Sequence, residues 1–154
     1  MSGSGSPDAP EIIFAFDYGT RRIGIATGDT LTRTARGLKT LENGPQPPWA
    51  AIAKLIGDYS PAKLLVGLPY NMDGSETALT PVIRRFAQNL KHRSGLPVTL
   101  VDERQSSREA ERQLREARAT GLKRKRVTHG DVDMTAAKVL LERWMSEISN
   151  RAQP

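Results

Sequence analysis

Acidic side chains fall where the chain is expected to pass from one element to the next. Asp17 ends the apolar run Ile12 to Phe16, and Asp102 and Glu103 follow the later run Val98 to Val101. In a sheet with a parallel portion, functional groups gather beyond the carboxyl ends of the strands, so both positions suggest chemistry. Acids in loops also serve simply to form turns, and the sequence leaves that alternative open.

A third candidate, Asp133, lies at the start of the last expected helix. It precedes Ala137, Leu140 and Trp144 by four, seven and eleven residues, a spacing that puts all four side chains on one helical face. The carboxylate is therefore expected to point toward the sheet. An acid in a first turn is also favoured by the helix dipole, and this simpler explanation fits the sequence equally well.

Together, Asp17, Glu103 and Asp133 suggest a site for Mg²⁺ or Mn²⁺. The chain has no cysteine and only two histidines, His92 and His129, so any metal must be held largely by oxygen. Both ions keep several waters and bind through a few carboxylates together with substrate phosphates. Metals held in this way activate water and stabilise the leaving oxygen when a phosphodiester is hydrolysed.

Positive charge predicts a polyanionic partner, with nucleic acid as the leading candidate. Lysine and arginine number 23 against 17 acids, giving a net charge of +6 and a pI of about 10.0. Arg21 and Arg22 lie in the first expected hairpin, and the arginine fork suits phosphate groups. A run of four cations, which favours a loop that contacts substrate, comprises Lys123, Arg124, Lys125 and Arg126. Solvated surface charge is the alternative for both sets.

The segment Pro69 to Ser75 follows another buried strand and adds three candidates. Asn71 and Asp73 could orient substrate or water, and Tyr70 could stack on a base. Asn and Asp before Gly74 could equally form a turn.

Hydrophobic patterning predicts one mixed α/β sheet of five strands with helices on both faces. Strands are expected at residues 12–16, 23–27, 35–41, 64–68 and 98–101, and helices at 49–56, from Thr80 or near Ser75 to Leu90, at 106–119 and at 132–148. The order βββαβαβαα predicts an antiparallel part formed by the first three strands. The later strands, joined by helices, predict a parallel part with right-handed crossovers.

Length and composition predict a single domain at residues 11–150. Residues 1–10, rich in Gly, Ser and Pro, are expected to be a disordered tail or a remnant of expression. No apolar run approaches the roughly 20 residues that span a bilayer, and the start of the chain lacks the pattern of a signal peptide. We therefore expect a cytoplasmic protein with no membrane partner.

Four segments resemble, in order, the signature blocks of the YqgF/RuvX family, the Holliday junction resolvases and pre-16S rRNA nucleases of bacteria. They read DYGTRRIGIATGD, VGLPYNMDGSET, VDERQSSREAERQL and VDMTAA, within a similarity that runs from about Ile12 to Trp144. The resemblance implies an RNase H-like, RuvC-type fold and a divalent-metal nuclease that acts on structured nucleic acid. Departures from the family's usual residues occur at Tyr70, Gln105 and Ser107, and they concern loop packing more than chemistry.

By matching motifs, the resemblance assigns Asp17, Glu103 and Asp133 to an acidic triad, with Arg104 and the loop of Asn71 and Asp73 beside it. It further implies maturation of the 5′ end of pre-16S rRNA, with the assembling small ribosomal subunit as a partner, or else DNA recombination and repair.

The sequence leaves four other questions open. The chain could be a non-catalytic nucleic-acid-binding adaptor that keeps only the basic surface. DYGT also resembles the phosphate loop of actin-like ATPases, although those enzymes bind nucleotide between two such lobes and this chain has length for one. RNA or DNA as substrate, and monomer or homodimer as assembly, are not decided by these patterns.

Overall fold

Five strands form one mixed sheet in the order β3-β2-β1-β4-β5. The structure, a computed structural model, describes residues 10–102 and 129–152. The strands are β1 (Ile12–Tyr18), β2 (Arg22–Asp29), β3 (Thr34–Glu42), β4 (Lys63–Leu68) and β5 (Val98–Asp102). The first three pair antiparallel, whereas β4 runs parallel to both β1 and β5. The predicted mixed sheet is confirmed.

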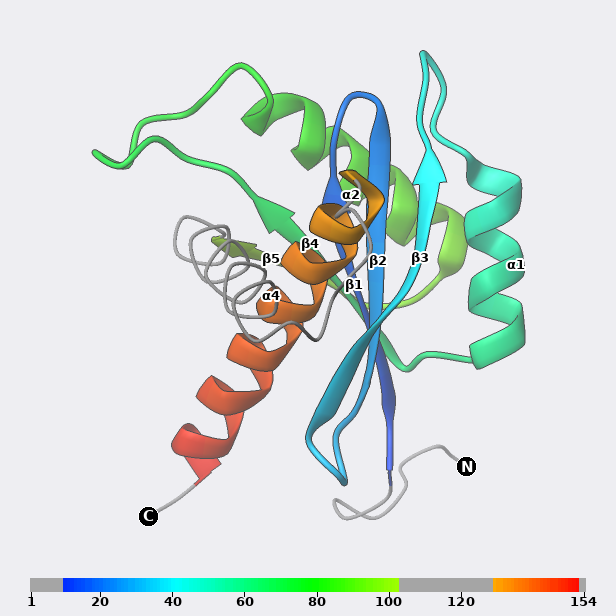
Figure 1. Ribbon diagram of the computed structural model, residues 1–154, viewed down its shortest axis with the longest axis vertical. Helices are drawn as coiled ribbons and strands as arrows, with labels where there is room; N and C mark the ends of the chain where they lie inside the picture. Colours follow the sequence, from blue (N-terminus) through cyan, green and yellow to red (C-terminus); the bar gives the residue numbers. More distant parts are fainter. Residues whose placement is uncertain (1–9, 103–128, 153–154) are drawn as a thin grey trace, which may run out of the picture.

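Helices cover both faces of this sheet (Figure 1). They are α1 (Trp49–Tyr59), α2 (Thr80–Ser94) and α4 (His129–Ala152). In this view α2 lies behind the sheet and α1 to the right of β3, while α4 crosses in front of the sheet. The helix predicted at 106–119 lies outside the described residues. Among the described helices, none combines the length and apolarity that a membrane crossing needs.

Alternation along β1 separates the core into two layers. Phe14 and Phe16 belong to the cluster that packs against α1 and α2, and Ile13 and Ala15 belong to the cluster that packs against α4. Successive side chains of a strand point to opposite faces, so the pattern fixes which helix each residue of β1 meets. The next odd-numbered residue, Asp17, therefore lies on the face that α4 covers.

Helix α2 begins at Thr80, which confirms the first of its two expected starts, and Thr80 makes no capping bond to its own helix. Its hydroxyl instead donates to the Pro69 carbonyl at 2.7 Å and accepts the Thr77 amide at 2.9 Å. Helix α4 begins at His129, earlier than the expected residue 132, so Asp133 lies one turn inside the helix and the dipole explanation loses force.

Candidate active site

Asp17 lies one residue before the end of β1 and is half-buried. It pairs directly with Gly24 of the antiparallel strand β2. Gly24, Ala26 and Gly28 form the side of β2 that faces α4. Asp17 thus projects from the centre of the sheet beneath the start of this helix.

Gly24 lets α4 approach the sheet closely enough to bring in a second acid. A Cβ atom added at Gly24 would collide with the Asp133 backbone carbonyl and would lie 2.9 Å from the Asp133 Cβ. Real Cβ atoms do not come so close to backbone atoms, so any larger residue at this position would push the helix away. The missing side chain of Gly24 therefore decides where Asp133 lies.

Asp17 and Asp133 converge on this one position. Cβ atoms of directly paired strand residues lie roughly 4.5–5.5 Å apart, and the Asp133 Cβ almost touches the Gly24 position, so the two aspartate Cβ atoms lie within about 8 Å of each other. An aspartate oxygen binds Mg²⁺ at about 2.1 Å, so one ion placed between the carboxylates would be within reach of both. This oxygen-only donor set fits Mg²⁺ or Mn²⁺.

The third predicted carboxylate, Glu103, follows β5 directly in the sequence but lies outside the described residues, as do Arg104 and the cations at 123–126. Within residues 10–102 and 129–152, no group of three acids or histidines comes together as a metal site. The described part of the chain thus supplies two of the three predicted ligands. The end of β5 is tied to α4, because Arg143 donates to the Asp102 carbonyl at 3.3 Å.

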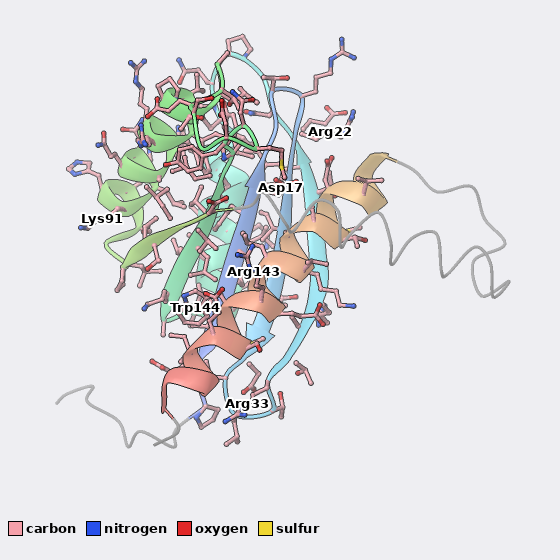
Figure 2. The ribbon with its side chains drawn as sticks, turned by 90° about the vertical axis from the view of Figure 1, so that its left-hand side faces the viewer. Asp17, Arg22, Arg33, Lys91, Arg143 and Trp144 are labelled. Carbon is pink, nitrogen blue, oxygen red and sulfur yellow. The ribbon has the colours of Figure 1, made fainter. Side chains whose placement is uncertain are left out.

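Arg22, predicted to contact phosphate, pairs with Asp133. Its Nε donates to Asp133 Oδ2 at 3.1 Å, and 36% of the arginine and 25% of the aspartate side chain remain exposed. Figure 2 shows Asp17 and Arg22 at the end of the sheet where α4 begins, whereas Arg33 lies at the opposite end. The site therefore combines two carboxylates with one partly exposed cation.

The turn that carries Arg21 and Arg22 is tightly held. The Gly19 amide donates to the Arg22 carbonyl at 2.8 Å, and a Cβ at Gly19 would lie 2.7 Å from that oxygen. Asn43 donates through Nδ2 to the Gly19 carbonyl and through its amide to the Arg21 carbonyl, each at 2.8 Å. Arg21 itself is exposed. The sequence patterns predicted no role for Asn43, which directly follows the last residue of β3.

The loop after β4 folds on itself as a turn. Asp73 Oδ1 accepts bonds from the Ser75 amide at 2.9 Å and hydroxyl at 2.6 Å, and the Asn71 amide group donates to the Ser75 hydroxyl at 3.0 Å. Gly74 has φ of +90°, a conformation that favours glycine. Asn71 and Asp73 thus form the turn that the sequence allowed as the alternative explanation. Both side chains remain exposed beside the end of β4.

Arg84 of α2 anchors this loop and was not a sequence candidate. It donates to Glu76 Oε2 at 2.6 Å and to the Tyr70 hydroxyl at 3.1 Å. The hydrogen bond to Glu76, followed by that to Tyr70, raises the pKa of Arg84 above its ordinary value. The Tyr70 ring packs against the core beside α2, so this residue has a structural role whether or not it meets a base.

Comparison with known proteins places this arrangement in a family. Residues 11–147 match the family model RuvX, described as a Holliday junction resolvase. A protein of Coxiella burnetii named "Putative pre-16S rRNA nuclease" is 43% identical over 145 residues, covering 94% of this chain and 99% of that protein. One of the same name from Burkholderia lata is 41% identical over 151 residues, covering 97% of each.

Solved structures share the fold at low identity. T. thermophilus RuvC in complex with a Holliday junction substrate aligns with a TM-score of 0.57 at 16% identity, covering 94% of this chain and 99% of that one. The fowlpox virus Holliday junction resolvase aligns with a TM-score of 0.54 at 14% identity, covering 88% and 99%. These similarities confirm the predicted RNase H-like, RuvC-type fold.

Proposed function

This chain belongs to the RuvX family of nucleases, and on that premise we propose that it is a cytoplasmic, divalent-metal-dependent endonuclease that matures the 5′ end of pre-16S rRNA. The names of the two relatives, at 43% and 41% identity over nearly the whole chain, support this choice of substrate. The assembling small ribosomal subunit is the setting in which such a precursor would be met.

The convergence of Asp17 and Asp133 at Gly24 carries the proposal. Two carboxylates held this close repel each other, and a bound divalent cation would offset that charge together with Arg22, which pairs with Asp133. A non-catalytic adaptor would need the basic surface but would gain nothing from this pair. We propose Asp17, Asp133 and Glu103 as the ligands of Mg²⁺ or Mn²⁺, which would supply a water activated for attack on the phosphodiester.

The protein's own groups would bind and orient the strand. Arg22 lies at the site and offers charge to a phosphate, and Arg21 extends from the same turn. The loop containing Asn71 and Asp73 follows the carboxyl end of β4 and would border the bound strand. We also propose Arg104 and the cations at 123–126 as further phosphate contacts, because nucleic acid affinity depends mainly on such charges.

The test is cleavage of two labelled substrates by purified wild type and Asp17→Asn protein. The substrates are an RNA that carries the pre-rRNA 5′ extension and a four-way DNA junction, each incubated with Mn²⁺, Mg²⁺ or EDTA. We expect metal-dependent cutting of the RNA by the wild type, and a loss of at least about a thousandfold in Asp17→Asn. Undiminished cutting by the mutant would contradict the proposed site.

Preference for the four-way junction would favour the alternative, a resolvase acting in DNA recombination or repair. This alternative rests on the description of the matching family. Symmetric cutting of two strands requires two sites related by a twofold axis, whereas trimming one RNA strand requires a single site. Light scattering of the protein with each substrate therefore separates a homodimeric resolvase from a monomeric processing enzyme. Binding of both substrates without cutting under any condition would favour the adaptor.

A further inference from the structure

The pairing of Arg22 with Asp133 uses only part of the arginine. Nε donates to Oδ2 at 3.1 Å, and no hydrogen bond joins Nη1 or Nη2 to a residue in the described ranges 10–102 and 129–152. The side chain is 36% exposed. Among the described residues, the fork is therefore bonded through Nε and retains N–H donors that a ligand can use.

We propose, on the basis of the nuclease function above, that Arg22 is a bridging residue. Its Nε holds the Asp133 carboxylate, and its Nη1 and Nη2 bind a non-bridging oxygen of the substrate phosphodiester. A guanidinium has five N–H donors in a rigid plane, so one edge can be fixed while another meets a phosphate. This arrangement sets the position of the strand relative to the carboxylate that is proposed to act on it.

The bridging role explains why a cation, Arg22, lies next to two acids at a site that is proposed to bind a polyanion. Asp17 and Asp133 would repel a phosphate that approaches from solvent, and Arg22 offsets that charge at the point of approach. The short turn stabilised by Asn43 restricts where the backbone of Arg22 can lie. Arg22 is thus oriented before the substrate arrives, which lowers the entropy lost on binding.

The role requires arginine and not merely a positive charge. Lysine presents all its donors from one nitrogen, so it could face Asp133 or the phosphate but would bridge the two poorly. Arg33 is the control, because it is exposed and Figure 2 shows it at the opposite end of the sheet from Arg22. Replacing Arg33 with lysine makes the same side-chain change without touching the bridge.

The experiment measures nucleic acid binding in EDTA, so that it does not depend on cleavage. Fluorescence anisotropy would give Kd for the labelled 5′-extended RNA and the four-way DNA junction over a range of salt concentrations. The proteins are wild type, Arg22→Lys, Arg22→Gln, Arg33→Lys, Asp133→Ala and the double variant Arg22→Gln/Asp133→Ala. Thermal melting of each protein confirms that it is folded under the conditions used.

We expect Arg22→Lys and Arg22→Gln to weaken binding by similar factors, roughly five- to twentyfold, while Arg33→Lys binds like the wild type. The salt dependence of Arg22→Gln should fall by about one unit of slope, the signature of one lost phosphate contact. In the Asp133→Ala background, the Arg22→Gln effect should shrink by about threefold or more, because the arginine is no longer held.

Three results would overturn the bridging role. Wild-type affinity in Arg22→Lys would mean that charge alone suffices, and wild-type affinity in Arg22→Gln would mean that Arg22 does not bind the strand. An undiminished Arg22→Gln effect in the Asp133→Ala background would show that Asp133 does not orient it. None of these results bears on metal-dependent cleavage, whose failure would instead appear as normal cutting by Asp17→Asn.

Discussion

The two faces of the sheet are built from different kinds of residue. Toward α1 and α2 the sheet presents large aromatic rings that pack against aromatic residues of the helices; the rings on this face are Phe14, Phe16, Tyr18, Trp49, Tyr59 and Phe86. Toward α4 the sheet presents mainly alanine and glycine, together with Ile13 and Leu65; the small residues here are Ala15, Gly24, Ala26, Gly28 and Gly37. We call the face toward α1 and α2 the thick face and the face toward α4 the thin face.

The difference separates stability from function. Aromatic rings bury large apolar areas and keep α1 and α2 at a distance from the backbone of the sheet. Glycine and alanine bury little themselves but let α4 come close, so that Asp133 reaches Asp17 and Arg22. A groove of about 430 Å³ between α1 and α2 lies on the thick face, and no acidic residue lines it. The thick face thus stabilises the fold, and the thin face positions the candidate site.

Removing a ring from the thick face should have the largest effect on stability and leave the site intact. Phe14 is fully buried and contacts the rings of Phe16 and Tyr59. We expect Phe14→Ala to lower the free energy of unfolding by about 3–5 kcal/mol, measured by urea denaturation. Mn²⁺ affinity measured by calorimetry on the folded protein should be unchanged, and a parallel loss of affinity would break the separation between the faces.

Adding one methyl group to the thin face should do the reverse. Gly24→Ala would force the first turns of α4 away from the sheet, because the added Cβ meets Asp133 backbone atoms. We expect Mn²⁺ to bind about 10–100-fold more weakly, the loss typical when a metal ligand is displaced or poorly oriented. Calorimetry gives the affinity, and the stability cost of overpacking should be about 1–3 kcal/mol.

Gly28→Ala is the matched control for Gly24→Ala. A Cβ at Gly28 would also meet α4, but its nearest atom is Leu141 Cδ2 at 2.8 Å, the end of a flexible side chain two turns beyond Asp133. We expect a comparable or smaller loss of stability, about 1 kcal/mol, with Mn²⁺ affinity within a factor of about two. If Gly28→Ala weakened Mn²⁺ binding as much as Gly24→Ala, the helix as a whole and not the Gly24 contact would set the site.

The turn beside the thin face should respond more weakly. Asn43→Ala removes the bond from Nδ2 to the Gly19 carbonyl. We expect a loss of about 1 kcal/mol in the free energy of unfolding and a severalfold weaker binding of the 5′-extended RNA, since Arg22 would be less well oriented. Asn43→Asp, which keeps the side-chain size but not the donor, should behave like alanine; wild-type behaviour of either variant would exclude this role.

The smallest effect is expected at Arg84, on the thick side. Its raised pKa means that the contribution of its charge is complete below the ordinary arginine pKa and would be lost only as the pH rises past the still higher value in the folded protein. The difference in melting temperature between wild type and Arg84→Met should therefore not vary with pH between about 7 and 9. A difference in melting temperature that changed steadily over this pH range would contradict the raised pKa of Arg84.

Much of the fold was predictable because it depends on local patterns. The apolar run at residues 64–68 predicted β4 within a few residues. The helical spacing that starts at Asp133 did the same for α4. The stripe of Ala137, Leu140 and Trp144 correctly predicted that Asp133 faces the sheet. The role of the Thr80 side chain was less predictable: its hydroxyl bonds to the Pro69 carbonyl, eleven positions away, instead of capping α2.

The candidate site was predictable in its residue types but not in its pairings. Nothing in the local pattern of Arg22 shows that it meets Asp133, because the two residues are 111 positions apart. The same holds for Gly24, whose sequence context suggests only relief of bulk in a strand. Asn43 and Arg84 carried no signal at all, since a hydrogen bond to a distant carbonyl or carboxylate leaves no periodic trace.

The sequence by itself determined which chemical groups are available and the order of the elements that hold them: oxygen ligands without cysteine, an excess of positive charge, and a mixed sheet with acids at Asp17 and Asp133. Only the tertiary structure decided that the absence of a side chain at Gly24 brings those acids together and that Arg22 pairs with Asp133. The reason is physical: periodicity records which face of an element is buried, whereas the closeness of two elements depends on the volume of every side chain between them.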